Sequence, residues 1–332
     1  MSPYSYETTA EEVANDLKPQ IAGKTILVTG VSPKGLGAAF AEIIAQYGPE
    51  CIILATRDLS KAEETALAIK ATGPSVRTHS VELDLASLDQ VRKAATKIQS
   101  FGEKIDVIVN NAAIMASPYF KTVDGIEGQF AVNYLGHFLL TNLLLPDMLA
   151  RNVPIRIVNV SSNGCRYGPV RFGDLDFSDG KHYNRWISYG QSKSASMLYT
   201  KALAEKLGQR NVHAFSLHPG VIMTNLGRSV AMEEFAELGE KIPQSNIERE
   251  LDKVQGHAHY WNQSFGFKSP SQGVATHVFA AFSPEIEKSN GAYLTNCKVK
   301  DVKHVYCWTR DSVDAERLWE LSEKLVGQEF TF

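Results

Sequence analysis

The sequence predicts an α/β fold built on one doubly wound parallel sheet, and three observations carry this prediction. From Lys24 onward, short runs rich in β-branched residues alternate with longer segments of helical periodicity. Several of the short runs are continuously apolar, as in Ile26–Val28 and Cys51–Ala55, as strands are when both faces of their sheet are covered. The chain has 332 residues, 44% of them hydrophobic, which is enough for one large core.

The first 23 residues are expected to form a strap that packs on the domain. Thr8 and Thr9 are each followed three residues later by a glutamate, Glu11 and Glu12. This is the capping-box pattern of a helix start, so a short amphipathic helix is predicted over residues 8–17.

Strands and helices then follow in regular alternation. The strands are predicted at 24–30, 51–56, 76–83, 104–110, 155–162 and 211–217, with a seventh near Ala292–Leu294. The helices between them are predicted at 37–48, 60–70, 89–99, 126–149, 188–208 and 269–282. Strands separated in this way by helices indicate a Rossmann-type sheet with helices on both faces.

Residues 225–268 interrupt this rhythm. Too few residues are present there to bury a separate core, so the segment reads as an insertion between two elements of the sheet. Residues 1–332 are therefore predicted to form a single domain.

Charge and cysteine content exclude several classes of partner. Lys and Arg number 34 against 37 Asp and Glu, a net charge of −3 that favours neither nucleic acid nor an anionic membrane. The four cysteines form no CxxC pair, which favours a reducing compartment over a disulfide framework or a zinc site. The acidic N-terminus holds no apolar run of signal-peptide or membrane-span length, so a cytoplasmic protein is expected.

A glycine-rich turn, T-G-V-S-P-K-G-L-G over residues 29–37, follows the first strand and opens a helix. Glycines there allow a pyrophosphate to approach the backbone, and the helix start offers N–H groups to it. A kinase-type P-loop is excluded because Leu36 and Gly37 stand where Lys and Ser/Thr are required. Taken alone, the turn fits a βα connection without a ligand equally well.

Two cations indicate which dinucleotide is bound. Arg57 follows the second strand directly, where an acidic residue would bind the ribose hydroxyl of NAD. A guanidinium there matches a phosphate, and Lys34 in the glycine turn could reach the same group, so NADP(H) is favoured. Asp58 keeps NAD open, and both cations could equally be solvated surface charges.

Tyr189 and Lys193 are spaced i, i+4 at the start of a predicted helix, so they share one face. A cation beside a phenol favours the phenolate and lowers the pKa of the phenol, which would make Tyr189 a usable proton donor and acceptor. A lone YxxxK is more often a surface pair.

This pair does not stand alone. The glycine turn and five further motifs occur in one order: Asn110–Ala113, Asn133, Ser161–Ser162, Tyr189–Lys193 and His218–Thr224. Together they resemble the short-chain dehydrogenase/reductase family from about Lys24 to Leu294.

The resemblance implies a catalytic tetrad of Asn133, Ser162, Tyr189 and Lys193. Tyr189 would transfer the proton to or from the substrate oxygen, Ser162 would hydrogen-bond that oxygen, Lys193 would bind the nicotinamide ribose, and Asn133 would support a water-mediated proton path. Ser161 would be structural. Cofactor-binding residues are expected to be Gly30, Ser32, Lys34, Gly35, Leu36, Gly37, Arg57, Asp84, Leu85, Asn111, Ala112, Ala113, Tyr189, Lys193, Pro219, Gly220, Ile222 and Thr224.

The chain departs from the commonest family pattern in three places. Pro33-Lys34 lengthens the glycine turn, Ala113 replaces a glycine, and 27 residues separate Ser162 from Tyr189. The segments 163–188, 269–285 and 314–327 resemble the retinol-dehydrogenase-like branch. The membrane anchor of many of its members is missing, which points to a soluble carbonyl reductase of the kind common in fungi.

The sequence therefore predicts NADPH-dependent, reversible reduction of a ketone or aldehyde. In this family the segment after the Pro-Gly motif covers the substrate, so residues 225–268 would form a lid, and its large apolar and aromatic side chains suggest a bulky apolar molecule. These side chains are Leu226, Val230, Met232, Phe235, Leu238, Tyr260, Trp261, Phe265 and Phe267, and they could equally be the inner face of a helical flap. Trp186 and Cys165 could line the same pocket. His257 and His259 lack further ligands at metal spacing, so no metal is expected.

Two alternatives stay open: NAD-linked alcohol oxidation by the same chemistry, and a non-catalytic dinucleotide sensor on the same fold. The apolar helices around 129–145 and 190–207 could also form a homodimer face, as in many relatives.

Overall fold

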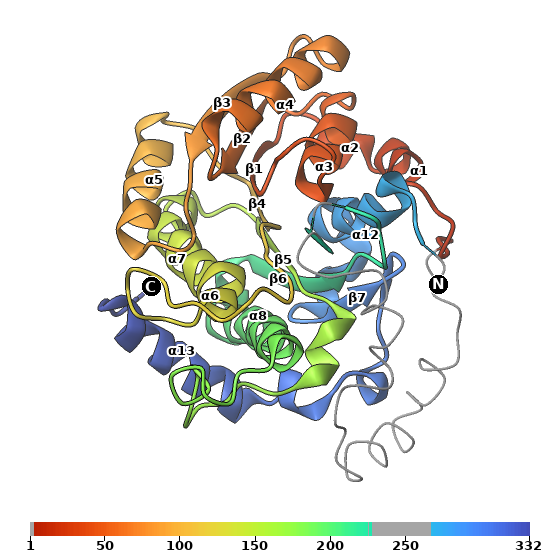
Figure 1. The fold of residues 1–332 in the computed structure, drawn as a ribbon. Helices are drawn as coiled ribbons and strands as arrows, with labels where there is room; N and C mark the ends of the chain where they lie inside the picture. The colour runs from red at the N-terminus through yellow and green to blue at the C-terminus, as the bar shows by residue number, and fades with distance from the viewer. Residues whose placement is uncertain (1–2, 225, 228–266) are drawn as a thin grey trace.

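A computed structural model describes residues 3–224, 226–227 and 267–332. Within these residues the chain forms one sheet of eight strands in the order β3-β2-β1-β4-β5-β6-β7-β8 (Figure 1). Only β8 runs antiparallel to its neighbour. The strands are β1 (Thr25–Thr29), β2 (Cys51–Thr56), β3 (Arg77–Glu82), β4 (Val107–Asn110), β5 (Ile155–Val160), β6 (Val212–His218), β7 (Tyr293–Thr295) and β8 (Lys298–Val299).

This topology confirms the predicted Rossmann-type fold. Strands β1, β2, β4 and β5 are buried along their whole length, as their apolar sequences require. All seven predicted strands are present. The two-residue strand β8 was not predicted, because so short a segment carries no periodic signal.

Helices cover both faces of the sheet (Figure 1). One face packs against α5 (Leu88–Ser100), α7 (Gly136–Leu149) and α8 (Arg185–Leu207), and α13 (Ser312–Val326) lies outside this layer. The other packs against α1 (Ala10–Asp16), α3 (Leu36–Ala45), α4 (Leu59–Thr72) and α12 (Pro270–Phe282), with α2 (Lys18–Ile21) leading into β1.

The helix predicted over 126–149 is divided into three parts. A short turn, α6 (Gly128–Phe130), is followed by a π-helical turn over Ala131–Leu135 and then by α7. In the π-helical turn the Gly136 N–H donates to the carbonyl of Ala131, five residues back. Such turns are rare and are found mostly at functional sites.

The N-terminal helix α1 packs on α12. Thr9 and Glu12 form the capping box of α1, whereas the Thr8 hydroxyl accepts from the Ser5 N–H and takes no part in the cap. The Ala10 N–H donates to Ser271 Oγ at 3.0 Å, which ties the start of α1 to the start of α12.

The C-terminal helix α13 covers the apolar faces of α7 and α8 (Figure 1). The Trp319 ring lies 5.2 Å from the Phe138 ring and 6.0 Å from the Tyr199 ring, measured between centroids. Tyr134 Oη and Ser322 Oγ are 2.6 Å apart. These faces are therefore occupied within the chain, which removes the argument on which a homodimer was predicted.

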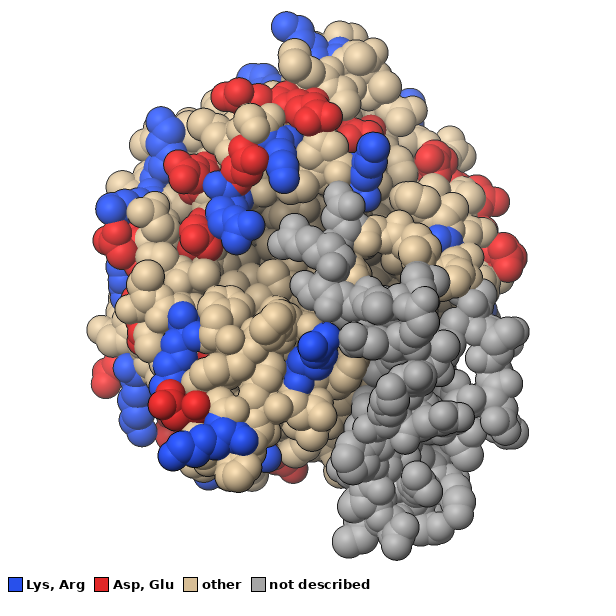
Figure 2. Space-filling view, in the orientation of Figure 1, with Lys and Arg blue, Asp and Glu red and all other residues tan. Residues whose placement is uncertain are grey.

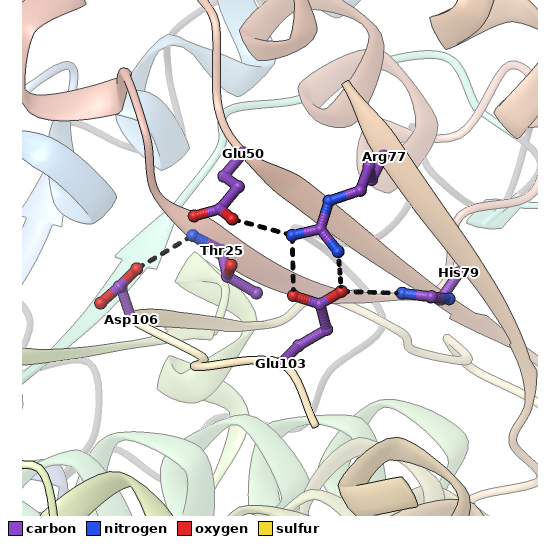
Figure 3. A network of polar contacts seen from close by, with 6 residues as sticks. All are labelled: Thr25, Glu50, Arg77, His79, Glu103 and Asp106. Atoms are coloured by element: carbon purple, nitrogen blue, oxygen red, sulfur yellow. Dashed lines mark hydrogen bonds and ion pairs between the residues drawn. The ribbon is translucent and has the colours of Figure 1, made fainter. Parts of the chain in front are cut away.

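A network of charged groups closes the amino ends of β1, β2 and β3 (Figure 3). Arg77 bonds both Glu50, at 2.8 Å, and Glu103, whose carboxylate also receives His79 Nε2 at 3.0 Å. The Thr25 N–H donates to the Asp106 carboxylate at 2.9 Å. These groups lie at the edge of the sheet opposite the carboxyl ends of the strands, so they serve the fold.

Most of the predicted lid, residues 225 and 228–266, lies outside the described residues, and so do His257 and His259. In the part of the chain that is described, no helix is both long and apolar enough to traverse a bilayer.

Candidate active site

The predicted catalytic residues come together at the carboxyl ends of the central strands, where parallel α/β sheets place their sites. Ser162 follows β5, Asn133 lies in the π-helical turn, and Tyr189 and Lys193 lie on consecutive turns of α8. Asn184 caps that helix by accepting from the Trp186 and Ile187 N–H groups, which fixes where α8 begins.

Tyr189 is 3% exposed, and its ring packs against the backbone of Gly164. A Cβ at Gly164 would lie 2.6 Å from a ring carbon of Tyr189, so only glycine fits there. Burial raises the pKa of the Tyr189 phenol to about 12, and a hydrogen bond with Ser162 opposes this rise. The phenol is therefore protonated at neutral pH.

Lys193 is 2% exposed and donates from Nζ to the carbonyl oxygen of Val160, the last residue of β5, at 2.8 Å. Its Nζ lies 5.7 Å from the centroid of the Tyr189 ring. Burial lowers the pKa of the Lys193 ammonium to about 7. The Tyr189 pKa is therefore raised rather than lowered as expected, because burial is the largest cause of the shift at both groups.

Ser161 and Ser162 have different surroundings, as predicted. Ser161 is buried and donates to the Lys193 carbonyl at 2.9 Å, which is a structural contact. Ser162 Oγ accepts from the Gly164 N–H at 3.0 Å and hydrogen-bonds Tyr189.

The Asn133 side chain fastens two neighbouring segments. Its Oδ1 accepts from the Ile114 N–H at 2.8 Å, and its Nδ2 donates to the Ile114 carbonyl at 2.9 Å and to Ser192 Oγ at 2.9 Å. The amide is therefore committed to positioning the loop after β4 against α8.

The turn after β1 fits a dinucleotide phosphate. Gly30 has a φ of 75°, in the left-handed region, and a Cβ there would lie 2.7 Å from Ala112 Cα. A Cβ at Gly37 would lie 2.5 Å from the Gly30 carbonyl oxygen. Helix α3 begins after Gly35 without a side-chain cap, so its first N–H groups are available to an anion.

Ser32, Lys34 and Leu36 lie in the same turn. Lys34 takes a φ of 64° and is exposed. This one left-handed residue lets the turn, which is expected to be one residue longer than the commonest family form, lead into α3 at Leu36.

The segment after β4 forms the floor of this region. Asn111 Nδ2 donates to the Thr29 carbonyl at 2.9 Å, and the N–H groups of Asn111 and Ala112 both donate to Thr29 Oγ1 at 3.0 Å. Ala113 continues the floor towards Ile114. Thr29 was not predicted as a site residue, since a strand threonine gives no signal of its own.

Residues Pro219–Thr224 leave β6 and lie against the same turn. A Cβ at Gly273 of α12 would lie 2.8 Å from Ile222 and 3.3 Å from Leu36, which places these two side chains together. Gly220 has a φ of 100°, and the stem of Lys268 packs against it. On the other side, Asp84 accepts from the Ala86 N–H at 3.0 Å, and Leu85 packs on Gly136 at the start of α7.

Arg57 and Lys34 are exposed, and neither forms an ion pair with another described residue. Asp58 is committed elsewhere: it caps α4 by accepting from the Ser60 N–H at 3.1 Å and from Ser60 Oγ at 2.6 Å. Figure 2 shows the surface hollowed near the centre of this view, with uncharged walls and lysine and arginine side chains around it.

Cys165 and Trp186 were predicted to line the substrate pocket. Cys165 lines a cavity of about 20 Å³, room for roughly one water, together with Met197 and Tyr306. The Trp186 ring packs on Tyr167, with the centroids 6.0 Å apart.

Sequence comparisons agree with this geometry. The family model "short chain dehydrogenase" matches residues 24–174. Human retinol dehydrogenase 14 is 38% identical over 318 residues, covering 92% of this chain and 87% of the relative. Short-chain dehydrogenase/reductase prx1 of Penicillium roqueforti is 34% identical over 328 residues, covering 94% of this chain and 88% of the relative.

Solved structures share the fold. An uncharacterized protein of Mycobacterium paratuberculosis superimposes with a TM-score of 0.68 at 30% identity, covering 96% of this chain and 98% of that one. The L-sorbose reductase of Gluconobacter frateurii, solved with NADPH and L-sorbose, gives a TM-score of 0.59 at 22% identity, over 85% of this chain and 98% of that one.

Proposed function

Because this chain belongs to the short-chain dehydrogenase/reductase family, in its retinol-dehydrogenase-like branch, we propose that it reduces a ketone or aldehyde to an alcohol with NADPH. The observation that carries the proposal is the buried Tyr189 phenol, hydrogen-bonded to Ser162 and facing Lys193 beside the glycine turn. When bound, NADPH supplies the hydride that adds to the carbonyl carbon.

The side chains have separate tasks in this reaction. Ser162 donates a hydrogen bond to the carbonyl oxygen and holds it beside the phenol. Tyr189 donates the proton that this oxygen takes up, and the phenolate that forms is stabilised by Ser162 and by the Lys193 ammonium. Lys193 also donates a hydrogen bond to the nicotinamide ribose. Its pKa of about 7 allows the side chain to become charged when a negative group approaches.

The protonated phenol suits the reductive step. Burial keeps Tyr189 protonated at neutral pH, and this is the form that donates a proton to the carbonyl oxygen, whereas alcohol oxidation starts from the phenolate. NAD-linked alcohol oxidation by the same residues is the second candidate.

The preference for NADPH rests on Arg57 and Lys34. Both are exposed next to the turn that fits the pyrophosphate, and Asp58, which would otherwise hold the ribose hydroxyl, serves as a helix cap. The test is the dissociation constants of NADPH and NADH, measured by protein fluorescence. We expect NADPH to bind at least tenfold more tightly, and Arg57→Gln to remove about tenfold of that preference.

Lys70→Gln, a change of an exposed lysine at the far end of α4, is the matched control and should alter neither constant. Tighter binding of NADH than of NADPH by the unaltered protein would overturn the cofactor assignment.

A bulky, poorly polar substrate is proposed on two grounds. The relatives called retinol dehydrogenases are named for retinol, an extended apolar alcohol, and residues 225–268 carry large apolar and aromatic side chains, among them Phe235, Trp261 and Phe265. Turnover of NADPH with a panel of aliphatic and aromatic ketones and aldehydes, retinal included, tests this. Faster turnover of small polar carbonyls would contradict it.

The four cysteines are all unpaired, which supports our proposal of a reducing, cytoplasmic location.

A further inference from the structure

One buried histidine lies between the predicted cofactor floor and the predicted proton path. His137, the second residue of α7, is 3% exposed. Its Nε2 lies 2.9 Å from Thr29 Oγ1 at the end of β1, and its Nδ1 lies 3.3 Å from the carbonyl oxygen of Asn133 in the π-helical turn.

The neighbours of this ring determine where its proton is. Thr29 Oγ1 already accepts from the N–H groups of Asn111 and Ala112, both at 3.0 Å. A hydroxyl has two lone pairs and one proton, so the Thr29 proton is donated to His137 Nε2. Nε2 is therefore an acceptor, and the neutral ring carries its own proton on Nδ1 and donates it to Asn133.

The ring must stay neutral for this chain of bonds to exist. A protonated imidazole has two donors and no acceptor, so it would place an N–H against the Thr29 hydroxyl proton. Burial, assisted by the nearby Lys193 charge, lowers the pKa of His137 to about 3, so the ring is neutral throughout the physiological range.

The two ends of this chain hold different parts of the site. Thr29 fixes the backbone of the turn at Asn111 and Ala112, and the Asn133 side chain fixes Ile114, three residues after Asn111. His137 thus connects the two residues that hold the ends of the floor segment, because its ring accepts a hydrogen bond from Thr29 and donates one to the Asn133 carbonyl.

We propose that His137 is a positioning residue which, as the neutral Nδ1–H tautomer, keeps the cofactor floor and the Asn133 turn in one arrangement. This rests on the proposed function in one respect only: the floor is taken to be where the dinucleotide lies. The bonding pattern itself makes a prediction that needs no cofactor.

The tautomer is measured directly, on the unliganded protein, by ¹⁵N NMR of histidine-labelled protein with assignment by the His137→Gln variant. We expect one buried ring with a protonated Nδ1 and an unprotonated Nε2, unchanged between pH 5 and 8. An Nε2–H ring, or a ring that titrates in this range, would overturn the proposal whatever the enzyme does.

The coupling is measured by a double-mutant cycle on the dissociation constant of NADPH and on kcat. Thr29→Val removes the hydroxyl at nearly constant shape, and His137→Leu removes both ring bonds. We expect each to weaken NADPH binding by roughly tenfold and the double variant to be no worse than either, since both break the same path. If the loss of NADPH binding in the double variant equals the product of the losses in the two single variants, the two residues act separately.

Rescue and a matched control complete the design. His137→Gln, whose amide offers one acceptor and one donor, should recover most of the binding that His137→Leu loses. His277→Leu replaces an equally buried histidine on α12 that bonds no described side chain, and should leave the NADPH constant within twofold. If His137→Leu also stays within twofold while the protein turns over NADPH, the positioning role is refuted and the proposed function stands.

Discussion

Replacing Lys193 by methionine should stabilise the protein near neutral pH, and the gain should shrink as the pH rises. Burial lowers the pKa of this lysine from 10.5 to about 7. At pH 7 Lys193 is almost fully protonated in the unfolded chain and about half protonated in the folded chain. Folding must therefore either remove this proton or bury the charged ammonium. Stability therefore rises with pH between about 7 and 10.5, by about 1.4 kcal/mol per pH unit.

The magnitude follows from these two pKa values. The buried lysine costs the folded state about 4 kcal/mol at pH 7 and about 2 kcal/mol at pH 9, and methionine, similar in length and uncharged, carries no such cost. The free energy of unfolding of Lys193→Met minus that of the unaltered protein should thus be about 2 kcal/mol smaller at pH 9 than at pH 7. Any difference in packing is independent of pH and cancels in this comparison.

The assay is urea denaturation of both proteins, without cofactor, at pH 7 and pH 9. Lys70→Met, a change of an exposed lysine on α4, is the control and should show the pH dependence of the unaltered protein. An equal difference between Lys193→Met and the unaltered protein at both pH values would refute the reasoning. The result bears on function because it measures how strongly burial disfavours the charged ammonium of Lys193. Binding of a negative group at the site would restore that charge.

Three further predictions concern other parts of the molecule. Gly37→Ala, whose Cβ would lie 2.5 Å from the Gly30 carbonyl oxygen, should weaken NADPH binding at least tenfold in fluorescence titration, and binding within twofold of normal would contradict the assigned cradle. Light scattering on the eluted protein should give the mass of one 36.6 kDa chain, because α13 covers α7 and α8; twice that mass would show that a dimer forms on another face or with α13 displaced. Glu103→Gln, which weakens the bonds to Arg77 and His79, should lower the free energy of unfolding by about 1–3 kcal/mol in urea while leaving the NADPH constant unchanged, and a loss of NADPH binding would refute the separation of the two edges.

The fold was predictable because its central strands are buried apolar runs of four or more residues that alternate with longer helical segments. The order of the strand-end motifs then placed Ser162, Tyr189 and Lys193 at one edge of the sheet. The fold follows from periodicity and from the geometry of parallel sheets, whereas the choice of these three residues came from the resemblance to the family.

What could not be predicted depends on contacts between distant segments. The spacing of Tyr189 and Lys193 puts them on one face of α8, but it does not say that Lys193 Nζ reaches Val160 or that burial dominates both pKa values. The π-helical turn at Asn133 has no sequence signature, and without it the place of His137 beside the Asn133 carbonyl cannot be inferred. The i, i+4 spacing of Asn133 and His137 was the one available signal, and it is common in any helix.

The C-terminal helix illustrates the same limit. Its amphipathic pattern was visible in residues 314–327, but the faces of α7 and α8 that it covers were equally consistent with a partner subunit. Periodicity shows that a face is buried and does not show what buries it.

The central claim is that the Tyr189 phenol delivers the proton to the carbonyl oxygen, and the Tyr189→Phe variant tests it most directly. With the best carbonyl from the substrate panel at saturating NADPH, we expect kcat to fall by about 10²–10⁴-fold, while NADPH binds to the variant within twofold of its normal constant. A variant that binds NADPH normally and reduces the carbonyl at an undiminished rate would contradict the account.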